Sequence, residues 1–222
     1  MQVVIPTYDG YNFLVPPCVH CLRKYWPEQP MNILVVNGGG KEIQLEKRVD
    51  TQVVYLGEDR QYGSNLIAAL DKFVKDEIFL LWLDDYMLHD VGRSVMAKAK
   101  ALITEPNIDC VRLSDVYTPE FTLFEPDNRF TYIDKKAQYS FSQQAALWRT
   151  GAFRRNLRDG EDPWETELNG SGRIEHGPDD AFGDFLGVNK PALQYHNILN
   201  KGVFDPKATA WLLEQGTWSL QC

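Results

Sequence analysis

Hydrophobic and polar residues alternate along the first half of the chain in a strand–helix rhythm. Short apolar runs predict strands at residues 2–6, 32–36, 52–56, 78–83 and 110–113. Between them, apolar residues recur at helical spacing over 16–26, 64–74 and 93–104. Serine 64 is expected to cap the second of these helices. The alternation predicts an α/β fold with a mostly parallel central sheet and helices on both faces.

The second half breaks this rhythm. Residues 121–124 and 130–133 are short and aromatic, which predicts antiparallel strands added to the sheet. A strand at 143–148 and a short helix at 153–157 are expected to follow. Since no low-complexity linker or repeat interrupts the chain, residues 1–222 are expected to form one domain.

The run from Ile78 to Leu83 ends in two adjacent acids, Asp84 and Asp85. An all-apolar run predicts a strand buried on both faces, and its carboxyl end lies where an open α/β sheet places its ligand crevice. Two neighbouring carboxylates repel each other unless a positive charge lies beside them. Mg²⁺ or Mn²⁺ is the simplest such partner. The alternative is a pair of solvated acids in a strand-to-helix turn.

Loops with glycine follow three predicted strands, at residues 7–10, 38–40 and 57–64. Loops at the carboxyl ends of parallel strands share one side of the sheet, so these converge on the crevice expected beside Asp84 and Asp85. None contains the Gly-Lys-Ser/Thr of a Walker A loop or a G-x-G-x-x-G fingerprint. The alternative for each is an ordinary strand-to-helix turn.

An acid-rich block, residues 160–167, has two compatible interpretations. Asp162 followed by Pro163 and Glu165 has the spacing of a helix N-cap with a capping box. Acids held at a helix start can also serve catalysis, which makes Glu161, Asp162 and Glu165 candidates for a general base.

The segment 194–202 adds a histidine and a lysine. His196 can complete a metal site whose other ligands are oxygens, although a lone histidine is more often structural. Lys201, followed by Gly202, can pair with a diphosphate from a flexible loop.

Charge and composition narrow the classes of partner. A net charge of −8 argues against general binding of nucleic acid. No apolar stretch has the length of a membrane span, and no basic leader precedes the first strand, so a cytoplasmic protein is expected. Cys18 and Cys21 fall at helical spacing and are expected on the buried face of a helix, without a metal or redox role.

Together these motifs resemble glycosyltransferases of the GT-A fold. The run Val4-Ile5-Pro6-Thr7-Tyr8 resembles the opening strand of family 2 enzymes, and Leu83-Asp84-Asp85-Tyr86 resembles their DxD metal motif, with adjacent acids in place of acid-x-acid. Residues 142–148, 161–167 and 195–202 resemble a Gln-rich strand, an "ExPWxxE" helix and a "Y-x-N-x-x-x-K-G" segment of bacterial and viral glycosyltransferase-like proteins.

The resemblance implies a single GT-A-like domain with a nucleotide-sugar-binding half, 1–115, and an acceptor-facing half, 116–222. It implies a UDP- or GDP-linked sugar donor and Mn²⁺ or Mg²⁺ as cofactor. Asp84 and Asp85 would be the metal ligands, with His196 as a third and with their division of labour open. The residues implied to hold the nucleoside and diphosphate are Pro6, Thr7, Tyr8, Asp9, Asp59, Arg60, Asp84 and Lys201.

It also implies a reaction, in which Glu161 or Asp162 deprotonates a hydroxyl of a glycan or polysaccharide acceptor for inverting displacement. Hydrogen bonds to a capping carboxylate lower its pKa, which favours Glu161. Aromatic residues that could form a platform for sugar rings are Tyr117, Phe121, Phe124, Tyr132, Trp148 and Trp164. Two alternatives remain, a non-catalytic module that binds nucleotide sugar or glycan, and a sugar nucleotidyltransferase.

Overall fold

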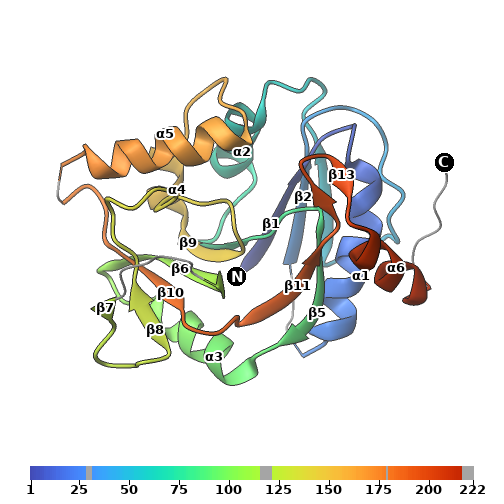
Figure 1. The fold of residues 1–222 in the computed structure, drawn as a ribbon. Coiled ribbons are helices and arrows are strands. Elements are labelled where there is room, and N and C mark those ends of the chain that lie inside the picture. Colours follow the sequence, from blue (N-terminus) through green and yellow to red (C-terminus); the bar gives the residue numbers. More distant parts are fainter. Residues whose placement is uncertain (29–31, 116–121, 179, 217–222) are drawn as a thin grey trace.

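The computed structural model describes residues 1–28, 32–115, 122–178 and 180–216. Within them a central sheet of nine strands has the order β3-β2-β1-β4-β9-β6-β10-β8-β7 (Figure 1). The strands of the first half are β1 (Gln2–Thr7), β2 (Asn32–Asn37), β3 (Thr51–Tyr55), β4 (Ile78–Leu81) and β6 (Ile108–Asp115). Those of the second half are β7 (Thr122–Leu123), β8 (Phe130–Tyr132), β9 (Ala146–Arg149) and β10 (Asp184–Val188).

The predicted parallel arrangement of the first half is confirmed. Strand β1 pairs in parallel with both β2 and β4, and β2 with β3. The carboxyl ends of β1, β2 and β3 therefore lie at one edge of the sheet, together with the residues that follow β4. The predicted antiparallel additions are also confirmed, because β9 runs against β4 and β6, and β7 and β8 form a hairpin beside β10.

Strict alternation along these strands separates two hydrophobic cores. Val3 and Ile5 belong to one core and Val4 to the other, and Leu80 and Phe79 divide in the same way. The helices over the first core are α1 (Val15–Tyr25), which follows the 3-10 turn η1 (Asn12–Leu14), α3 (Arg93–Leu102) and α6 (Pro206–Glu214). Those over the second are α2 (Tyr62–Lys72), α4 (Thr150–Asn156) and α5 (Pro163–Glu175). Both faces are thus covered, as the sequence predicts.

Cys18 and Cys21 lie on the buried face of α1, as expected. Burial raises the pKa of both thiols, that of Cys21 to about 12. A protonated, buried thiol is a poor nucleophile and a poor metal ligand.

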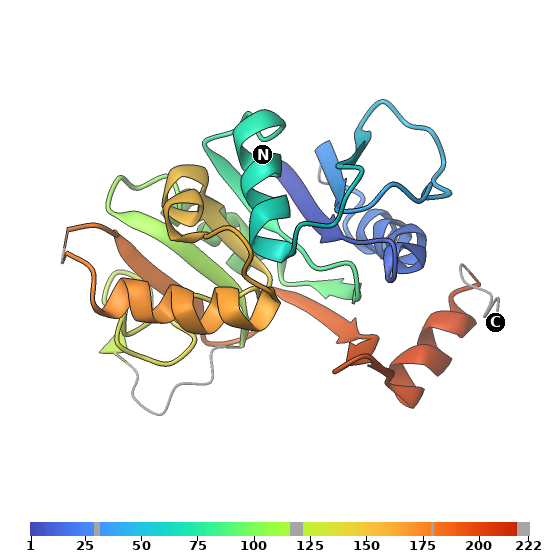
Figure 2. The ribbon, with the colours of Figure 1, turned by 90° about the horizontal axis from the view of Figure 1, so that it is seen from above.

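The sequence did not predict the ribbon that follows the two acids. Strand β5 (Tyr86–Val91) begins directly after Asp85 and pairs with β11 (Leu193–Asn197) in a separate antiparallel ribbon. The acids thus occupy a strand-to-strand turn, not a strand-to-helix turn. After β11 a small hairpin, β12 (Leu199–Asn200) and β13 (Val203–Phe204), leads to α6 at the far end of the molecule from α5 (Figure 2).

Two helix starts differ in how well they were predicted. The capping box at α5 is confirmed, since Glu165 N donates to Asp162 Oδ1 at 2.7 Å and Asp162 N donates to Glu165 Oε2 at 3.0 Å. The cap at Ser64 is wrong, because α2 begins earlier, after Gln61. Ser64 instead accepts a hydrogen bond from Gly160 N at 2.8 Å and so ties α2 to the acid-rich block. No helix in the described ranges is long and apolar enough to cross a membrane.

Candidate functional site

A cavity of about 650 Å³ opens at the carboxyl edge of the parallel strands. Its walls come from the end of β1, the loop after β3, the start of α2, the turn between β4 and β5, the segment before β9, the first turns of α5 and the segment from β11 to the β12–β13 hairpin. Segments far apart in the chain thus meet at the edge where the sequence predicts a crevice.

Asp84 is buried at the floor of this cavity, with 8% of its surface exposed. Its Oδ2 accepts a hydrogen bond of 2.5 Å from Thr7 Oγ1 at the end of β1. Burial, helped by the negative charge of Asp85 and opposed by the Thr7 hydrogen bond, raises the pKa of Asp84 to about 8. In the absence of a bound cation, Asp84 therefore takes up a proton near neutral pH.

Asp85 has less compensation than its neighbour. Burial raises its pKa to about 6, and its Oδ1 is buried with no hydrogen-bond partner among the described residues. The backbone around it is fixed, because Ile198 N donates to Asp85 O at 2.9 Å. An orphaned carboxylate oxygen beside a second buried acid is a donor set that suits a hard divalent cation.

The structure corrects the third ligand predicted from the sequence. His196 lies on β11 next to Asn197, and since side chains alternate along a strand, Asn197 lines the cavity while His196 faces away from it. Its ring packs in tilted arrangements against His89 and Trp211 of α6, with ring centroids 4.5 Å and 4.7 Å apart. The described ranges contain no group of three His, Cys, Asp or Glu residues placed to share a metal ion. The trio of Asp84, Asp85 and His196 is therefore not assembled, and His196 packs structurally.

The residues predicted to hold a nucleoside divide into two sets. Pro6, Thr7, Tyr8 and Asp59 line the cavity, and Asn65 Nδ2 donates to Asp59 Oδ1 at 2.8 Å. Tyr8 is exposed at the rim, with its ring centroid 4.9 Å from that of Tyr11. The carboxylate of Asp59, braced by α2, can accept hydrogen bonds from a planar base. The exposed ring of Tyr8 can stack on the face of such a base.

Asp9 and Arg60 lie outside the cavity lining, contrary to expectation. Asp9 Oδ1 accepts from Asn37 Nδ2 at 2.8 Å and from Lys41 N at 2.9 Å, and these hydrogen bonds lower its pKa. Asp9 thus joins the loops after β1 and β2. Arg60 is exposed, and its Nε lies 3.9 Å from Glu58 Oε2.

Lys201 lies on the cavity wall. It sits at the tip of the β12–β13 hairpin in a left-handed conformation, with φ of 51°, and Gly202 follows with φ of 77°. Two successive positive φ angles are typical of a tight hairpin turn, and they set the lysine at the cavity mouth. Its cation is placed on the same cavity as the two buried acids.

The two predicted bases, Glu161 and Asp162, do not line the cavity. Glu161 is buried and forms a two-pronged ion pair with Arg173, with distances of 2.7 and 2.8 Å, and it accepts a further bond from Asn169. Asp162 is committed to the N-cap. Both acids are satisfied by α5 itself, so the assignment of the base to either one is not supported by the geometry.

Glu167, one turn further along α5, is the acid that the sequence interpretation missed. It lines the cavity with Pro163 and Trp164, which precede it by four and three residues and therefore share its helix face. That spacing, counted from the predicted cap, could have identified it. Gln143 and Gln144 also line the cavity and were not proposed as site residues.

Of the aromatic residues proposed as a sugar platform, only Trp164 among the described ones lines the cavity, with 58% of its surface exposed. Trp148 and Phe124 are buried in the two cores, and Tyr132 packs against one of them. Tyr117 and Phe121 lie outside the described residues.

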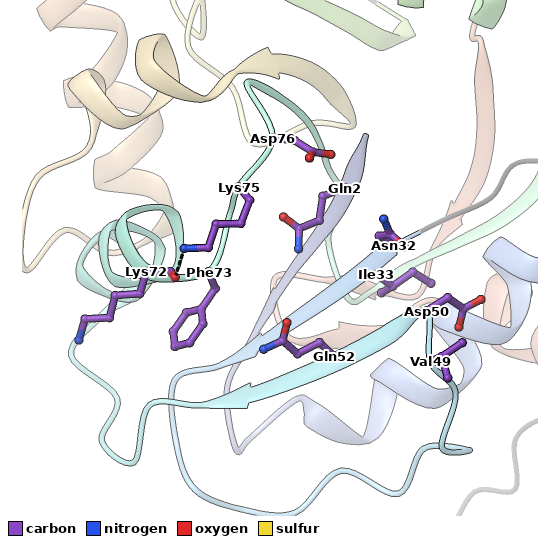
Figure 3. Close-up of a pocket in the computed structure, with 10 residues that line it drawn as sticks. All are labelled: Gln2, Asn32, Ile33, Val49, Asp50, Gln52, Lys72, Phe73, Lys75 and Asp76. Atoms are coloured by element: carbon purple, nitrogen blue, oxygen red, sulfur yellow. Dashed lines mark hydrogen bonds between the residues drawn. The ribbon is translucent and has the colours of Figure 1, made fainter.

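A second pocket, of about 360 Å³, lies at the opposite, amino-terminal edge of the sheet (Figure 3). It is surrounded by the starts of β1, β2 and β3 and by the segment after α2. Three of its charged groups have partners, since Asp76 pairs with the N-terminal amine at 3.0 Å, Asp50 pairs with Arg23 at 2.7 Å, and Lys75 Nζ donates to Lys72 O at 2.8 Å.

Comparisons with known proteins identify the fold. No protein-family model matches the sequence, and no curated protein matches it. Among solved structures, S. aureus TarS 1–349 in complex with UDP-GlcNAc aligns with a TM-score of 0.59 and 14% identity, over 91% of this chain and 59% of that one. Mannosyltransferase PcManGT from Pyrobaculum calidifontis, in complex with GDP-Man and Mn²⁺, aligns at 0.54 and 16%, over 95% of this chain and 59% of that one.

A UDP-glucose pyrophosphorylase complexed with UDP-glucose also aligns, with a TM-score of 0.58 and 8% identity, over 96% of this chain and 98% of that one. The chain therefore spans little more than half the length of both transferases and nearly the full length of the pyrophosphorylase. At these identities the likeness concerns architecture alone. The GT-A resemblance is confirmed at this level, and the chain has the α/β fold shared by these glycosyltransferases.

Proposed function

We propose that this protein is a metal-dependent glycosyltransferase that moves a sugar from a UDP- or GDP-linked donor to a hydroxyl of a glycan or polysaccharide acceptor. The observation that carries the proposal is the buried pair Asp84 and Asp85, which lines a cavity at the carboxyl edge of the sheet and leaves Asp85 Oδ1 without a hydrogen-bond partner among the described residues. The fold supports it, since the two transferases above are recorded with nucleotide sugars.

In this proposal Asp84 and Asp85 would hold Mn²⁺ or Mg²⁺. The bound ion would act as a Lewis acid and stabilise the negative charge that develops on the leaving diphosphate. Thr7 keeps Asp84 oriented through its hydrogen bond. Lys201, on the same cavity, would add a second positive charge toward the diphosphate.

The nucleoside is assigned to the wall formed by Pro6, Thr7, Tyr8 and Asp59. Asn65 braces Asp59, and this fixed carboxylate can accept a hydrogen bond from an N–H group on the edge of a base. Both uracil and guanine carry such a group, so the contact suits either donor class.

A sugar nucleotidyltransferase is the second candidate, favoured by the pyrophosphorylase that this chain matches over nearly its full length. Against it, the loop Thr7-Tyr8-Asp9-Gly10 lacks the glycine- and basic-rich sequence that such enzymes use for a triphosphate. A module that binds nucleotide sugar without turnover is the third.

The test is incubation with UDP-GlcNAc, UDP-glucose and GDP-mannose in the presence of Mn²⁺, with free nucleotide as the readout. We expect release of UDP or GDP that requires metal and is lost in Asp85→Asn. Formation of nucleoside triphosphate from donor and added pyrophosphate would instead establish the nucleotidyltransferase. Binding without release, with methyl glycosides supplied as acceptors, would establish the binding module.

A further inference from the structure

We infer that Glu167 is the general base that deprotonates the acceptor hydroxyl, an assignment that rests on the proposed function. Among the described residues, four carboxylates line the cavity, those of Asp59, Asp84, Asp85 and Glu167. Asp59 accepts bonds from Asn65 and Gln61 on the nucleoside side, and the adjacent pair is assigned to the metal. No histidine of the described residues lines the cavity. Glu167 is thus the remaining carboxylate, and it comes from the second half of the chain.

The geometry around Glu167 holds one oxygen and leaves the other free. Its Oε1 accepts bonds from Ser142 Oγ at 2.9 Å and from Gln143 N at 2.6 Å. No donor among the described residues bonds to its Oε2. A carboxylate fixed through one oxygen on a capped helix presents the other in a defined direction, which is the arrangement a general base needs.

A neighbouring amide supplies an independent sign of a ligand at this end of the cavity. Gln143 is buried, with 4% of its surface exposed, and its Oε1 accepts a hydrogen bond from Tyr62 Oη at 2.7 Å. Its Nε2 is buried with no partner in the described part of the chain. An unpaired buried donor costs free energy unless a ligand satisfies it, and a sugar hydroxyl is a suitable acceptor.

Trp164 completes this end of the cavity, because it lies on the same face of α5 as Glu167 and remains largely exposed. An exposed indole at a cavity mouth can pack against the apolar face of a sugar ring. Together Trp164, Gln143 and Glu167 would hold the acceptor, with its reacting hydroxyl toward Glu167 Oε2.

In the proposed step the acceptor hydroxyl displaces the nucleoside diphosphate directly from the sugar. The acceptor oxygen forms a bond to the anomeric carbon of the donor while its proton passes to Glu167 Oε2. The bond between that carbon and the diphosphate oxygen breaks, and the nucleoside diphosphate leaves with the electron pair. Glu167 then returns the proton to water. The products are a glycoside, or a free sugar when water is the acceptor, and a nucleoside diphosphate.

The deciding experiment compares Glu167→Gln with the wild-type protein. Glutamine retains the oxygen that Ser142 and Gln143 N bond to, so the fold and the local clamp are preserved while the base is removed. Nucleotide release from UDP-GlcNAc, UDP-glucose and GDP-mannose is measured with Mn²⁺, with methyl glycosides and with water as acceptors. Binding of each donor is measured separately by calorimetry.

We expect kcat to fall about 10²- to 10⁴-fold in Glu167→Gln, with the donor Kd within about twofold of wild type. Glu167→Asp, which keeps a carboxylate one methylene shorter, should recover part of the rate. The matched control is Glu175→Gln, an exposed acid of the same helix outside the cavity, which should leave both quantities unchanged.

A Glu167→Gln protein that binds donor normally and turns over within about fivefold of wild type would overturn the assignment while leaving the glycosyltransferase intact. A wild-type protein that releases no nucleotide from any donor would overturn the proposed function, and the assignment with it.

Discussion

The two cavities at opposite edges of the sheet differ in how their acids are compensated. At the amino-terminal edge, Asp50 and Asp76 each face a cation, and Asp76 is half-exposed to water. At the carboxyl edge, Asp84 and Asp85 are buried together, and Asp85 Oδ1 has no partner in the described ranges. Both regions are hollow and both contain acids. Of the acids that line these two cavities, those at the carboxyl edge include a buried carboxylate oxygen without a hydrogen-bond partner among the described residues.

This difference separates acids that support the fold from acids that await a ligand. Burying an uncompensated charge opposes folding, so such a group is retained where it serves a site. Replacing an acid that has partners should therefore lower the stability of the protein. Replacing an acid that lacks them should raise the stability and lower the activity.

The largest stability effect is expected at Glu161, which is buried and satisfied by Arg173. Glu161→Gln leaves the guanidinium without its anion, and we expect the free energy of unfolding to fall by about 3 kcal/mol. The turnover of the folded protein should remain near wild type. Chemical denaturation followed by assay below the unfolding midpoint measures both. A Glu161→Gln protein of normal stability with kcat lowered a hundredfold would make Glu161 the base after all.

The opposite sign is expected at Asp84. Its folded-state pKa, about 8, lies above the unfolded value of 3.8, so its contribution to stability is fully present below that lower value and is lost as the pH rises through 8. The metal-free protein should therefore become less stable between pH 5 and 8, and Asp84→Asn should remove this trend. At pH 8 we expect the variant to be more stable by about 2 kcal/mol, or roughly 5 °C in Tm.

Thermal unfolding in the presence of a chelator, at several pH values, makes this comparison, and Asp76→Asn is the control at the other edge. If Asp84→Asn lowers the Tm at pH 8, Asp84 is compensated by the fold and the distinction between the two edges fails.

The smallest effects are expected at the amino-terminal pocket. Asp76→Asn removes a solvent-exposed ion pair with the N-terminus, which should cost about 0.5 kcal/mol or less. Nucleotide release should stay within about twofold of wild type for Asp76→Asn and for Lys75→Met. A tenfold loss of turnover in either variant would show that this pocket takes part in function.

Much of this architecture could be predicted from short-range sequence signals. The run Ile78–Leu83 and its two acids, the capping box at Asp162 and Glu165, and the aromatic hairpin of the second half all depend on local patterns. Alternation of apolar residues predicted the parallel strands because each one is buried on both faces.

Contacts between distant segments could not be predicted in this way. The pairing of β5 with β11 turns His196 away from the acids, and no local pattern specifies that pairing. Arg173 lies twelve residues after Glu161, and its ion pair removes that acid from the list of bases. Glu167 could have been predicted, because helical spacing from Pro163 places it on the cavity side of α5. The sequence pattern instead favoured the acids at the start of the helix as bases.

The most direct test of the account is calorimetric titration of UDP and of GDP in the presence and absence of Mn²⁺. Three proteins are compared, namely the wild type, Asp84→Asn/Asp85→Asn at the carboxyl edge and Asp50→Asn/Asp76→Asn at the amino-terminal edge. We expect Mn²⁺ to strengthen binding of one nucleotide by at least about tenfold in the wild type and in the amino-edge variant, and we expect this gain to disappear in the carboxyl-edge variant. Equal metal-dependent binding by both variants, or nucleotide binding that ignores the metal, would contradict it.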